Sequence, residues 1–140
     1  MELSFIVIDD TDLDHFIAKR VITNKHKTAR VKSFMDATLA LEHITEERDD
    51  ASTKVVLIFL DIYMPIMNGF QFIDEFEKLH PDIQDKYYIV ALTSSREVSD
   101  INRIKSHGSF KTWLTKPITA DALSVLLNKV CTELNIQLPE

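Results

Sequence analysis

Residues 55–65 of the chain read VVLIFLDIYMP, six apolar residues in succession followed by Asp61. An unbroken apolar run of this length, rather than an alternating one, is typical of a parallel strand that is covered on both faces. The segment therefore predicts a central strand with an aspartate at its carboxyl end. The same pattern predicts further strands at residues 3–8 and 87–92, with weaker candidates at 29–34 and 110–114.

Helical patterns lie between these runs, because apolar residues recur there three and four positions apart. Strand and helix alternate five times, which predicts an α/β fold with a doubly wound parallel sheet and helices on both faces. Asp36 and Thr119 are predicted helix caps, and His80-Pro81-Asp82 is read as a break in the chain. The predicted apolar stripes are Leu13, Phe16, Ile17 and Val21; Ala37, Ala40, Leu41 and Ile44; Phe72, Ile73, Phe76 and Leu79; Val98, Ile101 and Ile104; and Ala122, Leu123, Leu126, Leu127, Val130 and Leu134.

Length and composition limit the possible functions. A chain of 140 residues predicts one domain, with a core at about 3–134 and a frayed tail at 135–140. The net charge of −6 argues against broad nucleic-acid binding, which needs an excess of Lys and Arg. No apolar stretch approaches the ~20 residues needed to cross a bilayer. Because Met1-Glu2-Leu3 leads directly into the first predicted strand, we expect no signal segment and a cytoplasmic protein.

Polar residues follow four of the predicted strands, at points that a parallel sheet brings to one edge. Asp9, Asp10 and Asp61 then lie together, and like charges at short range raise one another's proton affinity. A positive partner is therefore needed, and the candidates are Lys116 and Mg²⁺, which prefers oxygen ligands. With Asp61 as nucleophile, Asp9 and Asp10 at the metal, and Lys116 and Thr93 on phosphoryl oxygens, this set suits phosphoryl transfer.

Four motifs carry a resemblance to a known family. They are Ile8-Asp9-Asp10; Leu60 to Pro65 (LDIYMP) followed by Met67-Asn68-Gly69; Leu92 to Ser95 (LTSS); and Thr115 to Ile118 (TKPI). Their order and spacing over about residues 3–134 resemble the receiver domain of two-component response regulators. The resemblance implies a flavodoxin-like (βα)5 fold with strand order 2-1-3-4-5.

The resemblance also implies roles for the residues of the site. Asp61 would be the phosphoacceptor, taking a phosphoryl group from a phosphohistidine on a sensor histidine kinase or a histidine phosphotransfer protein. Asp10 and Asp61 would bind Mg²⁺ directly, the backbone carbonyl of Tyr63 would be a further ligand, and Asp9 would act through water. Lys116 would bind the phosphoryl group.

A conformational switch is implied as well. Thr93 stands at the position of the switch hydroxyl and Trp113 at that of the switch aromatic residue. Tyr63 and Ser95 would flank the path of the water that attacks the phosphoryl group, and the Lys116-Pro117 bond is often cis in relatives. The switch would act on the face formed by the fourth helix, fifth strand and fifth helix of the family, through which a homodimer is also possible.

Three functions stay open. The first is a stand-alone receiver that signals by changing its binding to an unspecified downstream protein, and that as an enzyme would catalyse only its own phosphorylation and dephosphorylation. The second is a scaffold that keeps the fold without being phosphorylated. The third is a small aspartate-dependent phosphatase, which is disfavoured because Asp9 and Asp10 are adjacent rather than arranged as Asp-x-Asp. Nucleotide or flavin binding is disfavoured too, since Gly69 and Gly108 are the only glycines.

Overall fold

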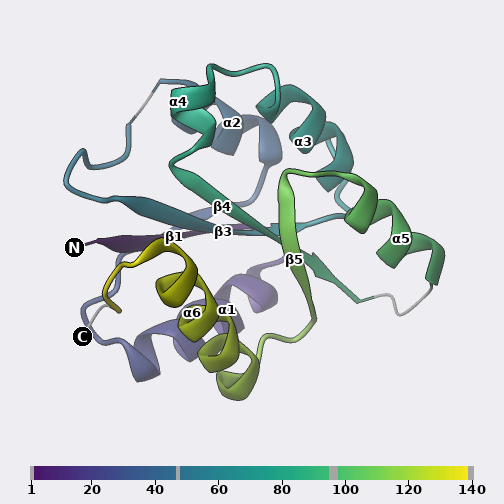
Figure 1. Ribbon diagram of the computed structural model, residues 1–140. Coiled ribbons are helices and arrows are strands. Elements are labelled where there is room, and N and C mark those ends of the chain that lie inside the picture. The colour runs from purple at the N-terminus through teal and green to yellow at the C-terminus, as the bar shows by residue number, and fades with distance from the viewer. Residues whose placement is uncertain (1, 47, 95–97, 139–140) are drawn as a thin grey trace.

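A computed structural model describes residues 2–46, 48–94 and 98–138, which form one five-stranded parallel sheet with helices on both faces (Figure 1). The strand order is β2-β1-β3-β4-β5, so the predicted order 2-1-3-4-5 is confirmed. The elements are β1 (Leu3–Ile8), α1 (Asp12–Lys25), β2 (Val31–Phe34), α2 (Ala37–Thr45), β3 (Val55–Asp61), α3 (Gly69–Phe76), α4 (Pro81–Gln84), β4 (Tyr87–Thr93), α5 (Val98–Ser106), β5 (Phe110–Thr115) and α6 (Ala120–Leu134).

The three central strands are buried along their whole length, as their unbroken apolar runs predict. β2 and β5 are the edge strands, and their residues are mostly half-buried or exposed. β3 and β4 each extend one residue beyond the predicted end, to Asp61 and Thr93. Two candidate functional residues are therefore the last residues of central strands rather than members of loose loops.

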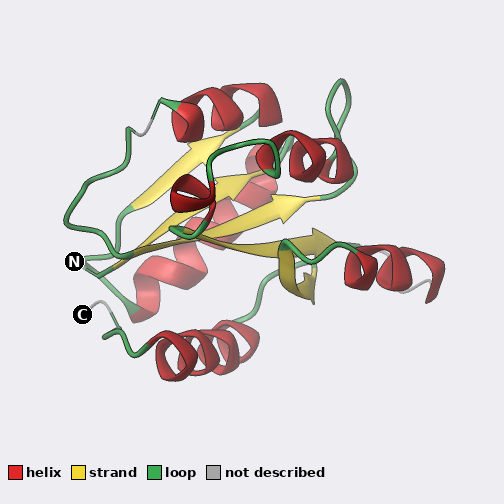
Figure 2. Cartoon of the chain, turned by 45° about the horizontal axis from the view of Figure 1, so that its top comes forward, coloured by secondary structure: helices red, strands yellow, loops and turns green. Residues whose placement is uncertain are grey.

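Two apolar layers hold the sheet between its helices. Side chains of a strand alternate between faces, so Phe5 and Val7 of β1 join the layer under α1 and α6, whereas Ile6 and Ile8 join the layer under α2 and α3. Figure 2 shows the same arrangement from a second direction, with helices on both sides of the sheet. Because the strands are parallel, their carboxyl ends meet at one edge of this sheet.

The helices begin where their capping residues predict. The Asp36 carboxylate accepts a hydrogen bond from Thr38 N at 2.6 Å, and the Thr119 hydroxyl accepts one from Ala122 N at 3.2 Å. Asn68 and Gln71 form a reciprocal capping box at the start of α3. These contacts satisfy backbone donors that no helical carbonyl can reach.

Gly69 opens α3 immediately behind the end of β3. A Cβ atom at this position would lie 2.7 Å from Ile62 Cα and 3.1 Å from the Asp61 carbonyl oxygen, closer than packed atoms approach. Gly69 N also donates to the Ile62 carbonyl at 3.0 Å. The absence of a side chain is therefore what allows α3 to start directly against this turn.

The predicted apolar face of α1 is confirmed only in part, since Val21 packs against the core and Ile17 is half-buried, whereas the other two residues are exposed. Leu13 and Phe16 are 66% and 60% exposed, and the buried residues of α1 are His15, Ala18 and Ile22. His15 turns inward because its Nε2 bonds to the Asp9 carbonyl oxygen at 2.8 Å, and the small Ala18 faces the same way. A pattern that counts large apolar residues misses a face made of a histidine and an alanine.

The predicted break at His80-Pro81-Asp82 is instead the one-turn helix α4. Proline suits the first position of a helix, where no backbone donor is required, and His80 Nδ1 accepts a hydrogen bond from Asp82 N at 3.1 Å. In the part of the chain that the structure describes, no helix combines the length and apolar character needed to span a membrane.

Candidate functional site

Three carboxylates lie together at the carboxyl edge of the sheet. Asp9 follows β1, Asp61 ends β3, and Asp10 stands beside Asp9 at the entrance to α1. One carboxylate oxygen from each lies within 4.8 Å of those of the other two. Asp9 and Asp61 are buried, whereas Asp10 is more accessible. The predicted grouping of these three residues is confirmed, because strands aligned in parallel end at one edge.

Lys116 enters the same cluster from the end of β5. Its Nζ lies 2.7 Å from Asp9 Oδ2, 3.2 Å from Asp61 Oδ2 and 3.0 Å from Asp14 Oδ2. Its backbone N donates to the Thr93 carbonyl oxygen at 2.9 Å, which ties the end of β5 to the end of β4. The Lys116-Pro117 peptide bond is cis, as in the resemblance described above. One ammonium therefore serves several carboxylates.

Asp14, in the first turn of α1, is the member of this cluster that the sequence patterns missed. Its only signal was an acidic residue near a helix N-terminus, which is common and usually explained by the helix dipole. Contact with Lys116 depends on how α1 is rotated about its axis. The pattern of apolar residues predicted that rotation wrongly.

The electrostatics of the site are unbalanced. Burial and the nearby charge of Asp9 raise the pKa of Asp61 from 3.8 to about 6, and Lys116 offsets this only in part. Burial would lower the pKa of Lys116, but its contacts with Asp9 and Asp14 outweigh that effect and raise it. The lysine thus stays charged, and among the described residues it offsets the repulsion between the Asp9 and Asp61 carboxylates only in part.

Asp9 shows where a cation would fit. Its Oδ1 accepts hydrogen bonds from Thr11 N at 3.0 Å and Thr11 Oγ1 at 3.1 Å. Its Oδ2 is buried and, within the described residues, accepts no aligned hydrogen bond, although the Lys116 ammonium is close by. A buried carboxylate oxygen beside two further carboxylates suits a hard divalent ion that takes oxygen ligands. The residues of the site can therefore hold a metal.

The other predicted residues lie around this cluster. Tyr63 N donates to Asp61 Oδ1 at 3.1 Å, and its phenol donates to Asp100 Oδ1 on α5 at 2.5 Å. Thr93 is 1% exposed and lies one position beyond Leu92, the register partner of Asp61. Trp113 is half-buried in β5, with Lys105 Nζ 5.1 Å from its ring centroid. Ser95 lies outside the described residues.

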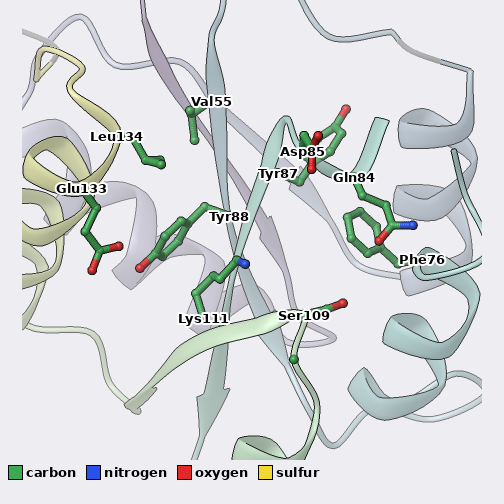
Figure 3. A pocket seen from close by; sticks show the side chains of 11 residues that line it. Val55, Phe76, Gln84, Asp85, Tyr87, Tyr88, Ser109, Lys111, Glu133 and Leu134 are labelled. Atoms are coloured by element: carbon green, nitrogen blue, oxygen red, sulfur yellow. The ribbon is translucent and has the colours of Figure 1, made fainter. Parts of the chain in front are cut away.

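A cleft of about 310 Å³ lies at the opposite, amino edge of the sheet (Figure 3). Its walls include Tyr87, Tyr88 and Lys111, and the carboxylate cluster is not among its residues. Several polar side chains of the cleft already form hydrogen bonds within the protein, so fewer of them remain to bind a ligand. These bonds join Tyr87 to Asp49, Ser109 to Glu77, and Gln84 to the Leu79 carbonyl.

Comparison with known families decides the identity of this arrangement. Residues 5–128 match the family model described as the response regulator receiver domain. The chain belongs to this family. The match covers most of β1, all of the other four strands and the whole carboxylate cluster, so the resemblance is confirmed.

Solved structures of receivers share the fold. A response regulator receiver protein from Dyadobacter fermentans has a TM-score of 0.80 and 25% identity, covering 91% of this chain and 96% of that one. A two-component response regulator from Cytophaga hutchinsonii has a TM-score of 0.81 and 27% identity, covering 93% of this chain and 97% of that one.

Among curated relatives are two fungal proteins. "Stress response regulator protein 1" of Lodderomyces elongisporus is 26% identical over 105 residues, which are 74% of this chain and 26% of that protein. "Transcription factor SKN7" of Chaetomium thermophilum is 34% identical over 94 residues, which are 67% of this chain and 11% of that protein. The matched part of this chain therefore spans about a quarter of the length of the first relative and about a tenth of the second.

Proposed function

We propose that this receiver accepts a phosphoryl group on Asp61 from a phosphohistidine, in a reaction that requires Mg²⁺, and that the change alters its binding to a partner protein. The observation that carries the proposal is the charge imbalance around Asp61. Asp9, Asp10 and Asp61 lie close together, and the Lys116 ammonium pairs with Asp9 and Asp61, so the site favours a further cation beside a nucleophilic carboxylate. Receiver domains are in general signalling phosphoacceptors rather than classical enzymes.

Each residue has a defined task in this proposal. Asp10 and Asp61 bind the metal directly, Asp9 acts through water, and the Tyr63 carbonyl is a further ligand. Bound Mg²⁺ supplies positive charge next to the phosphoryl oxygens. Lys116 binds another of these oxygens, a task that suits an ammonium already held 3.2 Å from Asp61 Oδ2.

The transfer itself is a displacement at phosphorus. An oxygen of Asp61 forms a bond to the phosphorus atom while the bond between phosphorus and the histidine nitrogen breaks, and the imidazole keeps the electron pair of that bond. With a pKa of about 6, Asp61 is mostly ionised at pH 7 and is ready to act as nucleophile. Catalysis then consists mainly of positioning and charge neutralisation.

The switch and its partners are also part of the proposal. Thr93 ends β4, and its hydroxyl would turn to the phosphoryl group and shift the neighbouring α5, with Trp113 following. The family's signalling face here consists of α5, β5 and α6. A groove of about 480 Å³ lies between β5 and α6, and Val125 in its lining is 70% exposed. Receiver domains interact with histidine kinases or phosphotransfer proteins. Four points stay predictions: binding to a downstream partner, a homodimer through this face, the single-domain organisation and a cytoplasmic location.

Mass spectrometry tests the phosphorylation directly. The protein is incubated with Mg²⁺ and a small phosphodonor such as phosphoramidate, and we expect one phosphoryl group per chain. Asp61→Ala and wild type with EDTA should stay unlabelled, whereas Asp12→Asn, which alters an exposed acid in the same edge region, should be labelled like wild type. Labelling of Asp61→Ala, or no labelling of wild type, would contradict the proposal.

The same samples separate the two alternative functions. Many turnovers of a generic phosphate ester per protein would indicate the phosphatase rather than the receiver. Partner binding that is unchanged by the phosphodonor and by Asp61→Asn would indicate the phosphorylation-independent scaffold.

A further inference from the structure

Asp14 is fixed in place before any ligand arrives. Its Oδ2 accepts a hydrogen bond of 2.6 Å from the Thr11 hydroxyl, whose oxygen also lies 3.1 Å from Asp9 Oδ1, so that one proton serves the two carboxylates. The same Asp14 oxygen accepts a hydrogen bond from Lys116 Nζ at 3.0 Å. Helix α1 thus presents a third carboxylate to the Lys116 ammonium, in addition to those of Asp9 and Asp61.

The Lys116 ammonium is surrounded by carboxylates. Those of Asp9, Asp14 and Asp61 lie within 3.2 Å of Lys116 Nζ, and within the described residues Asp14 is the one that accepts an aligned hydrogen bond from it. A phosphoryl oxygen that binds the ammonium would therefore compete with these carboxylates, and with Asp14 for that hydrogen bond. Asp61 carries the phosphoryl group, and the side chain of Asp9 is 0% exposed, whereas that of Asp14 is 28% exposed.

We propose that Asp14 is a positioning residue that holds Lys116 in the unphosphorylated protein and competes with the phosphoryl group for its ammonium. The inference rests on the proposed function, since it concerns how Asp61 keeps its phosphoryl group. Asp14 acts through Lys116 and does not touch the reacting atoms. Its effect is to weaken binding of a phosphoryl group and so to favour the unphosphorylated state.

The test compares two aspartates of the first turn of α1. Asp12 and Asp14 are the acidic residues there, and Asp12 is exposed. Asp14→Asn removes the charge that holds Lys116 but keeps the shape of the side chain, whereas Asp12→Asn makes the same change of net charge beside it. The probe is beryllofluoride, a phosphoryl mimic, titrated calorimetrically at saturating Mg²⁺.

Asp14→Asn should bind beryllofluoride about three- to tenfold more tightly than wild type, the range expected for releasing a half-buried ion pair. Asp12→Asn should change the affinity by less than about twofold, as expected for an exposed charge that is screened by salt. Unchanged or weaker binding by Asp14→Asn overturns the inference. An equal gain in both variants also overturns it, because general charge reduction would then be the cause.

A second readout needs no metal. In ¹⁵N NMR of the metal-free protein, protons of the Lys116 ammonium should exchange with water faster in Asp14→Asn than in wild type and Asp12→Asn. Equal exchange in all three would show that Asp14 does not hold the lysine. Failure of the proposed function is distinguishable, since wild type would then bind no beryllofluoride at all, whereas failure of this inference leaves wild-type binding intact and the two variants alike.

Discussion

Asp61 and Asp49 lie at opposite edges of one sheet, and both side chains are nearly inaccessible, at 8% and 4% exposure. Their ionisation nevertheless shifts in opposite directions. Burial, with the charge of Asp9, raises the pKa of Asp61 to about 6. Burial acts on Asp49 in the same sense, but hydrogen bonds from Tyr87 and His43 outweigh it and lower its pKa.

The difference lies in the number of donors for each carboxylate. Asp49 receives the Tyr87 phenol at 2.5 Å, His43 Nε2 at 2.9 Å and Lys32 Nζ at 3.2 Å. At the other edge a single ammonium is divided among several carboxylates. The amino edge is therefore complete by itself, whereas the carboxyl edge gains from an added cation. Burial alone does not decide which aspartate is functional.

The largest effect is expected from removing the carboxylate at the amino edge. Asp49→Ala removes the buried carboxylate that accepts hydrogen bonds from the Tyr87 phenol and His43, and should lower the free energy of unfolding by about 2–4 kcal/mol. Urea unfolding at pH 7 measures this. Asp50→Ala is the matched control, because its neighbouring ion pair with Arg30 is exposed, and it should lose much less. Equal losses would remove the distinction between the two edges.

Replacing Asp61 should have the opposite sign. In metal-free protein at pH 7, Asp61→Asn relieves carboxylate repulsion and should raise the free energy of unfolding by about 2 kcal/mol, from a pKa shift of roughly two units with some loss to relaxation. The pKa of Asp61 is higher in the folded protein than in the unfolded chain. The contribution of this group to the free energy of unfolding is therefore fully present below about pH 4 and is lost as the pH rises through about 6. Wild type should show this decline in urea unfolding and Asp61→Asn should not. A destabilised Asp61→Asn would contradict the imbalance.

Added Mg²⁺ should supply the missing charge. At a concentration tenfold above its dissociation constant, the metal should stabilise wild type by about 1.4 kcal/mol. Thermal unfolding with and without Mg²⁺ checks this, and Asp61→Asn should respond much less. Asp49→Ala, if folded, should respond like wild type because the amino edge takes no part. Stabilisation of Asp61→Asn equal to that of wild type would place the ion elsewhere.

The smallest effect concerns the bond between Tyr63 and α5. Tyr63→Phe removes a hydrogen bond to Asp100 near the surface, which should cost about 0.5 kcal/mol or less. Hydrogen exchange of residues 98–106 should nevertheless quicken, since the phenol links this helix to the turn after Asp61. Tyr88→Phe removes a phenol at the amino edge instead and should leave exchange of α5 unchanged. No difference between the two variants would argue against this link.

The sequence was informative where burial dominates. Unbroken apolar runs predicted the three central strands, and the shared edge of parallel strands placed Asp9, Asp61 and Lys116 together. Family membership then followed from four short motifs. The roles of Thr93 and Trp113 in a switch stay predictions, because they concern a change between two states.

The misses around the site trace to one cause, the rotation of α1 about its axis. That rotation places His15 and Ala18 inward, exposes Leu13 and Phe16, and brings Asp14 to Lys116. It depends on a bond from His15 to a backbone carbonyl, which no count of apolar residues can detect. Charged neighbours of a strand-end site are therefore hard to predict when they come from a helix.

Gly69 gives α3 an influence on a site to which it lends no side chain. Because only a hydrogen atom fits between the start of this helix and the backbone of Ile62, any larger residue must push the turn that follows Asp61. The location of the proposed phosphoacceptor is thus set partly by a steric limit and not only by ionic contacts. Substitutions at position 69 offer a route to displacing Asp61 while the chemical groups around it stay the same.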